Sequence, residues 1–251
     1  MRIDKFLAVK LGSRTKAAAA IEKGLVLVNG KPVQSSYVVK DGDDVTVNRA
    51  EEDYVSAGGF KLSKALKDFG YPISGKIFAD IGASTGGFTD CLLKNGAKKV
   101  YCIDVGESQL DKSLLSQNVV VIDNFNARGL TREVFSDKID GVVIDVSFIS
   151  LTYVLKNIAD VLETGGIVFA LIKPQFECES RSVGKNGIVK DKKTHEKIIK
   201  KICGYASNVG LAPQMLTNAP IVKGKNKEFV ILLEKDGNPA DENKLISSVI
   251  L

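Results

Sequence analysis

Hydrophobic and polar residues alternate in two different ways along the chain, and the change falls near residue 50. In the first part, apolar positions recur at helical spacing and then at strand spacing. We expect helices at 2–10 and 14–23 and short strands at 25–28, 31–33 and 44–47. Asn29-Gly30 is typical of a type I′ hairpin turn, which needs positive φ at both central residues. The pattern therefore predicts a small α+β module at the front of the chain.

After Pro72, short apolar runs alternate with helical stretches. Continuous apolar runs are typical of strands that are buried on both faces of a parallel sheet. We expect such strands at 77–81, 100–104, 119–124, 140–145, 166–173 and 227–233. The predicted fold class is therefore α/β, a Rossmann-like sheet preceded by the small module.

The composition favours a cytoplasmic protein with a substantial core. Hydrophobic residues make up 44% of the 251 residues. No run approaches the roughly 18 apolar residues that a membrane span needs. The first residues also lack the apolar segment of a signal peptide. We therefore expect no membrane partner.

The cysteines and the histidine give little support for metal or disulfide chemistry. The four cysteines are Cys91, Cys102, Cys178 and Cys203, and they form no C-x-x-C pair. We expect buried free thiols and no metal site. The single histidine, His195, has lysines on both sides, which favours a solvated helix residue over a catalyst.

Positive charge is concentrated in the front module. Residues 1–49 hold nine basic and five acidic residues, so they carry +4 of the net charge of +5. Such a concentration is expected where a module contacts the phosphates of a nucleic acid. The candidate contacts are Arg2, Lys5, Arg14, Lys16, Lys23 and Lys31. Contacts of this kind position a nucleic acid without reading its sequence.

A cofactor site is predicted where the first strand of the α/β part ends. The loop after Asp80 consists of small residues, which let backbone amides approach a ligand closely. Position 84 is serine, although the dinucleotide fingerprint requires glycine there, and Asp80 would repel a pyrophosphate. Asp80 can instead bind the amino-acid part of a cationic cofactor, and Asp104 can bind ribose hydroxyls. The candidates are Asp80, Gly82, Ser84, Thr85, Gly86, Gly87, Phe88, Asp104, Asp123, Asn124 and Asp145. For Asp123 and Asn124, ordinary turn chemistry is an equal alternative.

Polar residues at three other strand ends predict a catalytic centre. Asp145 and Lys173 each follow an apolar run, and Glu228 opens the last run. If the last strand is antiparallel, these residues meet at the rim where open α/β sheets hold ligands. A lysine between carboxylates can orient an alcohol nucleophile. Whether it also takes the proton depends on burial and on nearby carboxylates, which shift its pKa in opposite directions. Structural ion pairing is the alternative for each residue alone.

Several of these segments resemble known families. Arg2–Leu7, Ser13–Ala17 and Gly24–Lys31 resemble the alpha-L RNA-binding domain named after ribosomal protein S4, which implies binding to structured RNA. The form Asp80-x-Gly82-x-x-x-Gly86 resembles that of S-adenosylmethionine-dependent methyltransferases and implies S-adenosylmethionine as the cofactor.

Lys61, Asp145, Lys173 and Glu228 match the Lys-Asp-Lys-Glu tetrad of FtsJ-type ribose 2′-O-methyltransferases. With the RNA-binding module in front, the whole chain resembles the TlyA (hemolysin A-like) family of ribosomal RNA methyltransferases. The resemblance implies a seven-stranded sheet with an antiparallel last strand. It also implies 2′-O-methylation of cytidines in the RNA of the small subunit, the large subunit or both. Ala57 departs from the arginine that relatives often carry, which could weaken a phosphate contact or the coupling of the domains.

The resulting domain division is 1–48 for the RNA-binding module, 49–57 for a linker and 58–251 for the methyltransferase domain. The charged stretch 175–191 has the length of an active-site loop that orders on RNA, or of a plain surface loop.

Three other functions stay open on the sequence. A base methyltransferase would use a strand end such as Asp145–Phe148, which lacks the usual Pro-Pro, or a cysteine nucleophile such as Cys178. A ribosome assembly factor would bind RNA without turnover. A membrane-active hemolysin would need a long apolar segment or a strongly amphipathic cationic helix, and the sequence supports neither.

Overall fold

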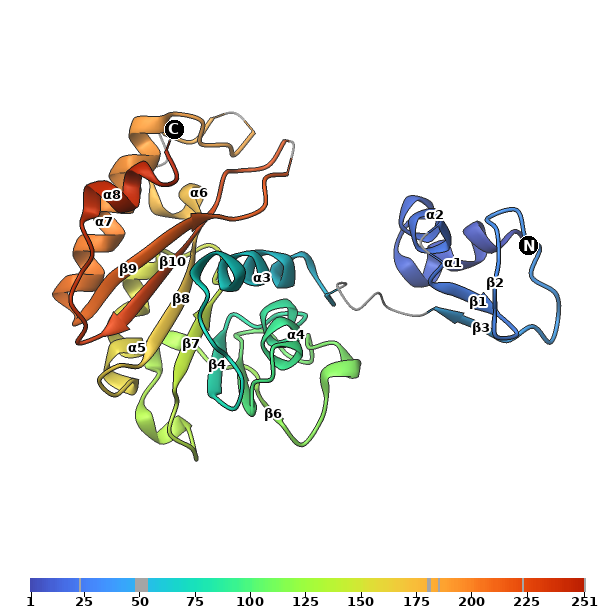
Figure 1. Ribbon diagram of the computed structural model, residues 1–251, viewed down its shortest axis with the longest axis horizontal. Helices are drawn as coiled ribbons and strands as arrows, with labels where there is room; N and C mark the ends of the chain where they lie inside the picture. The colour runs from blue at the N-terminus through green and yellow to red at the C-terminus, as the bar shows by residue number, and fades with distance from the viewer. Residues whose placement is uncertain (23, 48–53, 180–181, 185, 223, 251) are drawn as a thin grey trace. The chain divides into compact units, whose positions relative to one another are not determined.

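The computed structural model describes residues 1–22, 24–47, 54–179, 182–184, 186–222 and 224–250, except for the side chain of Lys16. It divides into two compact units, residues 1–53 and 54–251 (Figure 1). The predicted linker residues 49–53 and the predicted RNA contact Lys23 lie outside the described residues, as does the side chain of Lys16.

The first unit is the predicted α+β module. Its elements are α1 (Ile3–Leu11), α2 (Arg14–Glu22), β1 (Val26–Val28), β2 (Lys31–Pro32) and β3 (Val45–Val47). The strands form an antiparallel sheet in the order β2-β1-β3. Asn29 and Gly30 have φ of 51° and 77°, as the hairpin prediction requires. Six buried side chains form the core: Ile3, Leu7, Ala17, Ile21, Val26 and Val28.

The second unit is built on a seven-stranded sheet in the order β6-β5-β4-β7-β8-β10-β9. The strands are β4 (Ile77–Ile81), β5 (Lys99–Ile103), β6 (Val119–Ile122), β7 (Gly141–Ile144), β8 (Ile167–Ile172), β9 (Leu211–Asn218) and β10 (Phe229–Lys235). β10 is antiparallel to β8 and β9, which confirms the expected last strand. We did not predict β9, because this edge strand mixes buried apolar residues with Gln214 and Thr217 and contains Pro213.

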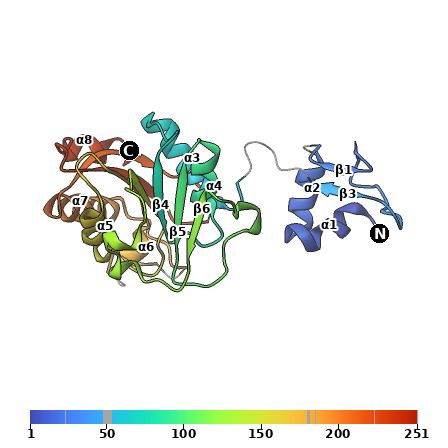
Figure 2. The same cartoon turned by 90° about the horizontal axis from the view of Figure 1, so that it is seen from below.

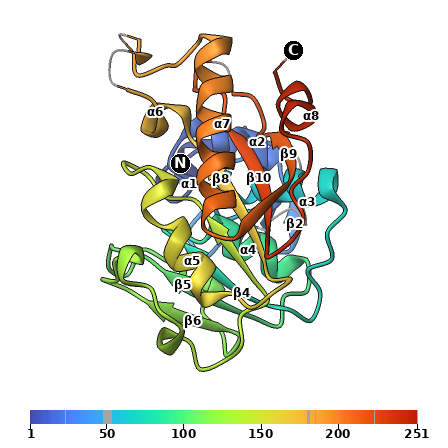
Figure 3. The same ribbon diagram turned by 90° about the vertical axis from the view of Figure 1, so that its left-hand side faces the viewer.

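Helices cover both faces of this sheet (Figures 1 and 2). One face packs against α3 (Ala57–Phe69) and α4 (Gly87–Lys94). The other packs against α5 (Leu155–Val161), α7 (Lys192–Asn208) and α8 (Glu242–Ser247), which lie in front of the sheet in Figure 3. The short α6 (Pro174–Glu177) follows β8, and single 3₁₀ turns occupy Lys112–Leu114, Ala127–Gly129, Arg132–Val134 and Leu151–Tyr153.

His195 corrects one prediction. It lies on α7 with only 5% of its surface exposed, so the expected solvated position is wrong. Its ring meets the Phe229 ring edge to face, with centroids 5.5 Å apart. The apolar residues Ile198, Ile199 and Ile202 follow it at helical spacing, which places His195 on the side of α7 that faces the sheet.

Three of the free cysteines, Cys91, Cys102 and Cys203, are buried as predicted, whereas Cys178 is half-buried. Burial raises the pKa of each of the three buried thiols to about 12. Among the described residues, no helix is long and apolar enough to cross a membrane, and no cluster of side chains could hold a metal ion.

The strand order reverses between β4 and β7, which are neighbours although two strands separate them in sequence. In open α/β sheets, ligands bind beside the carboxyl ends of strands at such a point. Asp80, Asp104, Asp145 and Lys173 all lie at the carboxyl ends of parallel strands around this reversal. The topology therefore brings the predicted residues to one rim.

Candidate active site

The loop between β4 and α4 contains residues with positive φ, and its close packing requires that conformation. Gly82 has φ of 80°, and a Cβ there would lie 2.9 Å from the carbonyl oxygen of Asp145. Ser84 also has positive φ, and its amide donates to Asp104 Oδ2 at 2.8 Å. The second oxygen of Asp104 accepts from the Gly106 amide at 2.8 Å. Asp104 thus holds the loop after β4 and the turn after β5 together.

Asp80 is fully buried and incompletely satisfied. The Thr89 hydroxyl donates to Asp80 Oδ2 at 2.7 Å, while Asp80 Oδ1 has no hydrogen-bond partner among the described residues. Burial raises the pKa of Asp80 from 3.8 to about 7, and the nearby Asp145 and Asp104 carboxylates act in the same direction. A buried carboxylate with one unused oxygen fits a cationic donor such as an ammonium group.

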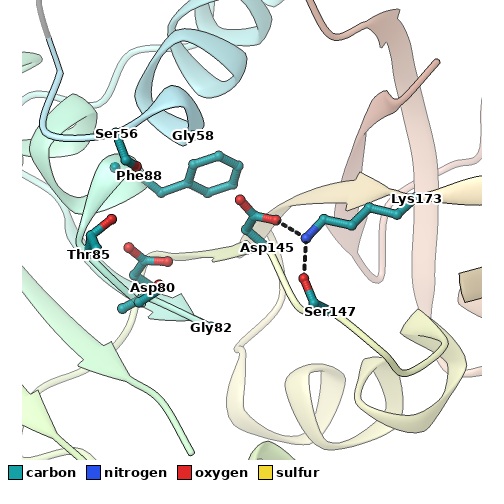
Figure 4. Close-up of a pocket in the computed structure, with 12 residues that line it drawn as sticks. Ser56, Gly58, Asp80, Gly82, Thr85, Phe88, Asp145, Ser147 and Lys173 are labelled. Carbon is teal, nitrogen blue, oxygen red and sulfur yellow. Dashed lines mark hydrogen bonds and ion pairs between the residues drawn. The ribbon is translucent and has the colours of Figure 1, made fainter. Parts of the chain in front are cut away.

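Two adjoining cavities lie at this rim, with volumes of about 170 and 530 Å³. Both are lined by Gly82, Ser84, Asp145 and Ser147. The smaller is also lined by Ser56, Gly58, Asp80, Ala83, Thr85, Gly87, Phe88 and Lys173 (Figure 4). The larger has a mostly apolar wall, formed by Ile81, Ile103, Val105, Phe125, Ala127, Val146, Phe148 and Ile149, with Asp104 at its edge.

Three predicted cofactor residues lie outside the lining of these cavities. A Cβ on Gly86 would meet Leu110 and Leu114, so Gly86 is needed for packing. Asp123 Oδ2 accepts from the Ser108 amide at 2.9 Å, and Asn124 has φ of 56° in the same turn region. Their observed contacts are those of turn residues.

The four predicted catalytic residues form two ion pairs. Lys173 Nζ lies 2.6 Å from Asp145 Oδ1, and Lys61 Nζ lies 2.6 Å from Glu228 Oε2. The Lys173 side chain is 10% exposed, and the other three are 16–23% exposed. Lys173 and Glu228 line one further cavity of about 460 Å³. The four side chains therefore come from α3, the ends of β7 and β8, and the start of β10.

Ser147 is a member of the site that we did not predict. Lys173 Nζ donates to Ser147 Oγ at 2.7 Å, and Figure 4 shows the ammonium between this hydroxyl and the Asp145 carboxylate. Ser147 lines all three cavities named above. An ammonium has three N–H donors, so Lys173 keeps one for another acceptor. The sequence signal that could have identified Ser147 was its position two residues after Asp145.

Glu177 joins the two segments that carry Asp145 and Lys173. Its buried carboxylate accepts from Ser150 Oγ and the Leu151 amide, both at 2.6 Å, and pairs with Lys201 Nζ at 3.2 Å. We placed Glu177 in a charged loop, but it ends α6 and is 6% exposed, so a loop position is wrong for this residue. It ties the segment after β7 to the segment after β8.

Glu177→Gln is expected to lower the free energy of unfolding by about 2 kcal/mol, because hydrogen bonds to a buried charge contribute about 1.5–3 kcal/mol. Urea denaturation measures this change. The control is Glu196→Gln, since Glu196 forms an exposed pair with Lys200 on α7 and its loss should cost about 0.5 kcal/mol or less. Equal free energies of unfolding for the two variants would contradict the proposed stabilising role of Glu177.

The predicted RNA contacts of the first unit differ in their surroundings. Arg2 and Arg14 both pair with the buried Asp4, at 3.2 and 2.7 Å, and the Arg14 guanidinium helps to hold the pKa of Asp4 below its usual value. Lys5 and Lys31 are exposed. Arg2 and Arg14 therefore also have a structural role in this unit.

Comparisons with known proteins agree with both units. The profile of the FtsJ-like methyltransferases matches residues 54–235, and that of the S4 domain matches residues 1–45. Hemolysin A of Brachyspira hyodysenteriae is 44% identical over 92% of this chain and 98% of its own length. The 16S/23S rRNA (cytidine-2′-O)-methyltransferase TlyA of Mycobacterium tuberculosis is 39% identical over 79% of this chain and 75% of its own. A solved structure from Streptococcus thermophilus, described as a candidate hemolysin, is 37% identical, with a TM-score of 0.73, and covers 98% of this chain and 94% of that one.

Proposed function

Because this chain belongs to the TlyA (hemolysin A-like) family of FtsJ-like methyltransferases, we propose that it methylates a ribose 2′-hydroxyl of ribosomal RNA. The observation that carries this proposal is the Lys173–Asp145 ion pair in the lining of the cavity of Asp80. The second ion pair, Lys61–Glu228, adjoins it through the cavity that Glu228 and Lys173 line together. The name of the Mycobacterium relative suggests cytidine as the target nucleotide.

The cofactor of this proposal is S-adenosylmethionine, which supplies a methyl group on a positively charged sulfur. The unused oxygen of Asp80 would accept hydrogen bonds from its amino group. Asp104, at the edge of the larger cavity, would bind the ribose hydroxyls, and the apolar wall of that cavity would hold the base. Backbone amides after Gly82 can approach closely because side chains there are small.

Lys173 would orient the nucleophile. Asp145 and Ser147 hold two sides of its ammonium, so the third N–H can point to the 2′-oxygen of the substrate. This contact aims a lone pair of that oxygen at the reacting carbon, which is a positioning effect. Asp145 and Glu228 offer carboxylate oxygens that can accept the hydroxyl proton.

A methylation assay on ribosomal subunits tests the proposal. Subunits from cells that lack the gene would be incubated with the protein and radiolabelled S-adenosylmethionine, and the RNA digested to nucleosides. We expect label in a 2′-O-methylnucleoside. Label in a base would favour a base methyltransferase, and RNA binding without label would favour an assembly factor. Burial raises the pKa of the Cys178 thiol, which disfavours a cysteine nucleophile.

Lys5→Gln combined with Lys31→Gln is expected to weaken RNA binding and to lower its salt slope by up to about two, because each phosphate contact contributes roughly one. Affinity measured at several salt concentrations checks this. Stability should stay unchanged, since both side chains are exposed. In Arg14→Ala, by contrast, Asp4 loses an ion-pair partner, so binding and stability should both fall. An unchanged salt slope in the lysine variant would remove these contacts from the proposal.

A further inference from the structure

A basic cavity of about 490 Å³ lies where α7 begins, next to the start of β10. Its described lining contains four lysines, Lys190, Lys192, Lys225 and Lys227, together with His195, and no carboxylate. Asp191, next to two of these lysines in sequence, uses its carboxylate to cap α7 and accepts from the amide and hydroxyl of Thr194 at 2.8 and 2.7 Å. The described lining of the cavity is therefore predominantly basic.

His195 and Lys227 form the inner wall of this cavity and are held in place. Lys227 Nζ donates to the Val249 carbonyl at 2.7 Å and lies 5.5 Å from the centroid of the Phe229 ring. His195 is 95% buried, and its Nε2 has no hydrogen-bond partner among the described residues. Burial lowers the pKa of both groups, and the nearby lysines act in the same direction. A bound anion would relieve both effects, because it offers the charge and the acceptors that the wall lacks.

This basic cavity continues into the candidate active site. It shares Ile188, Gly224 and Lys225 with the cavity that Lys173 and Glu228 line. Lys227 also directly precedes Glu228 in sequence. An anion in the basic cavity would therefore lie beside a substrate bound at Lys173.

We infer that the basic cavity binds a backbone phosphate of the RNA strand that carries the target ribose. The inference rests on the proposed function, which places that ribose at Lys173. A phosphodiester suits the cavity because it is small, stays charged at neutral pH and offers only acceptor oxygens. Lysine and histidine side chains contact phosphate without reading the base, so this site would fix the position of the strand.

Lys190→Gln combined with Lys225→Gln tests the inference in the full chain. Both side chains are exposed, so folding should be preserved. With unmethylated ribosomal subunits as substrate, we expect KM for RNA to rise about tenfold, because charge-assisted contacts to the phosphate are lost. The salt slope of binding should fall by about one, and kcat at saturating RNA should change less than KM does. The matched control is Lys193→Gln with Lys197→Gln, which removes the same charge from exposed positions of α7 outside the lining. Equal effects of the two double variants would overturn the inference.

His195 provides a second, direct measurement, because it is the only histidine of the chain. In protein labelled with ¹⁵N-histidine, addition of a short single-stranded RNA should shift the imidazole signal. The shift should be lost in the Lys190→Gln, Lys225→Gln variant and kept in the control variant. An unperturbed signal at saturating RNA would overturn the phosphate site. If the signal responds but no methyl transfer occurs in the wild type, the proposed function fails and the phosphate site stands.

Discussion

Replacing Lys173 by alanine is expected to lower kcat for methyl transfer by about 10²–10⁴-fold, the range over which positioned proton-handling groups contribute to catalysis. Affinities for RNA and S-adenosylmethionine should change little. The physical reason is that Lys173 joins Asp145 and Ser147, at 2.6 and 2.7 Å, and still has an N–H for the substrate. Single-turnover assays with saturating cofactor measure the chemical step directly.

The control for Lys173 is Lys156→Ala. Lys156 also pairs with a carboxylate, Asp160, but on the exposed side of α5 with 66% of its side chain accessible. We expect its activity to equal that of the wild type. If Lys173→Ala lost RNA binding and turnover in the same proportion, Lys173 would be a binding residue and the assignment would be incorrect.

Asp80→Asn is expected to stabilise the cofactor-free protein at pH 8 and to weaken binding of S-adenosylmethionine. The rise in the pKa of Asp80 from 3.8 to about 7 corresponds to a cost of at most about 4 kcal/mol for the buried charge. Asparagine removes that charge while keeping an oxygen that can accept from Thr89. Cofactor affinity should fall on the order of 10- to 100-fold, because a contact to a charged group is lost. Denaturation curves and calorimetric titration measure the two effects.

The pH dependence of stability has a defined sign. The folded-state pKa of Asp80 is raised, so the folded protein binds more protons than the unfolded chain between about pH 4 and 7. The contribution of Asp80 to stability is therefore full below about pH 4 and is lost as the pH rises through 7. Asp80→Asn should lack this part of the pH dependence. Parallel stability profiles of the variant and the wild type would mean that burial does not raise the pKa of Asp80.

The sequence predicted most of the catalytic unit because its signals are local. A buried parallel strand reads as an apolar run, so β4 was predicted at its observed bounds, Ile77–Ile81. Polar residues that interrupt or end such runs stand out, which is why Asp145 and Lys173 were found. The antiparallel β10 was inferred from the family resemblance, and it brings Glu228 to the same rim.

The sequence could not predict which side chains from distant segments form ion pairs and hydrogen bonds with one another. No local pattern pairs Lys61 with Glu228, or Glu177 with Ser150 and the Leu151 amide. His195 was misjudged for a related reason. Its sequence neighbours are lysines, but on a helix the residues three and four positions away share its side, and here Ile198 and Ile199 follow it at those positions and are buried.

The Lys61–Glu228 ion pair joins the first helix of the catalytic unit to its last strand. In a nascent chain, the loop between β4 and α4 and Asp145 can take up their positions once β7 has been synthesised. The fourth side chain arrives only when β10 has been inserted between β8 and β9. If methyl transfer requires all four side chains, a carboxyl-truncated copy that lacks β10 would therefore be inactive even with the cofactor cavity formed.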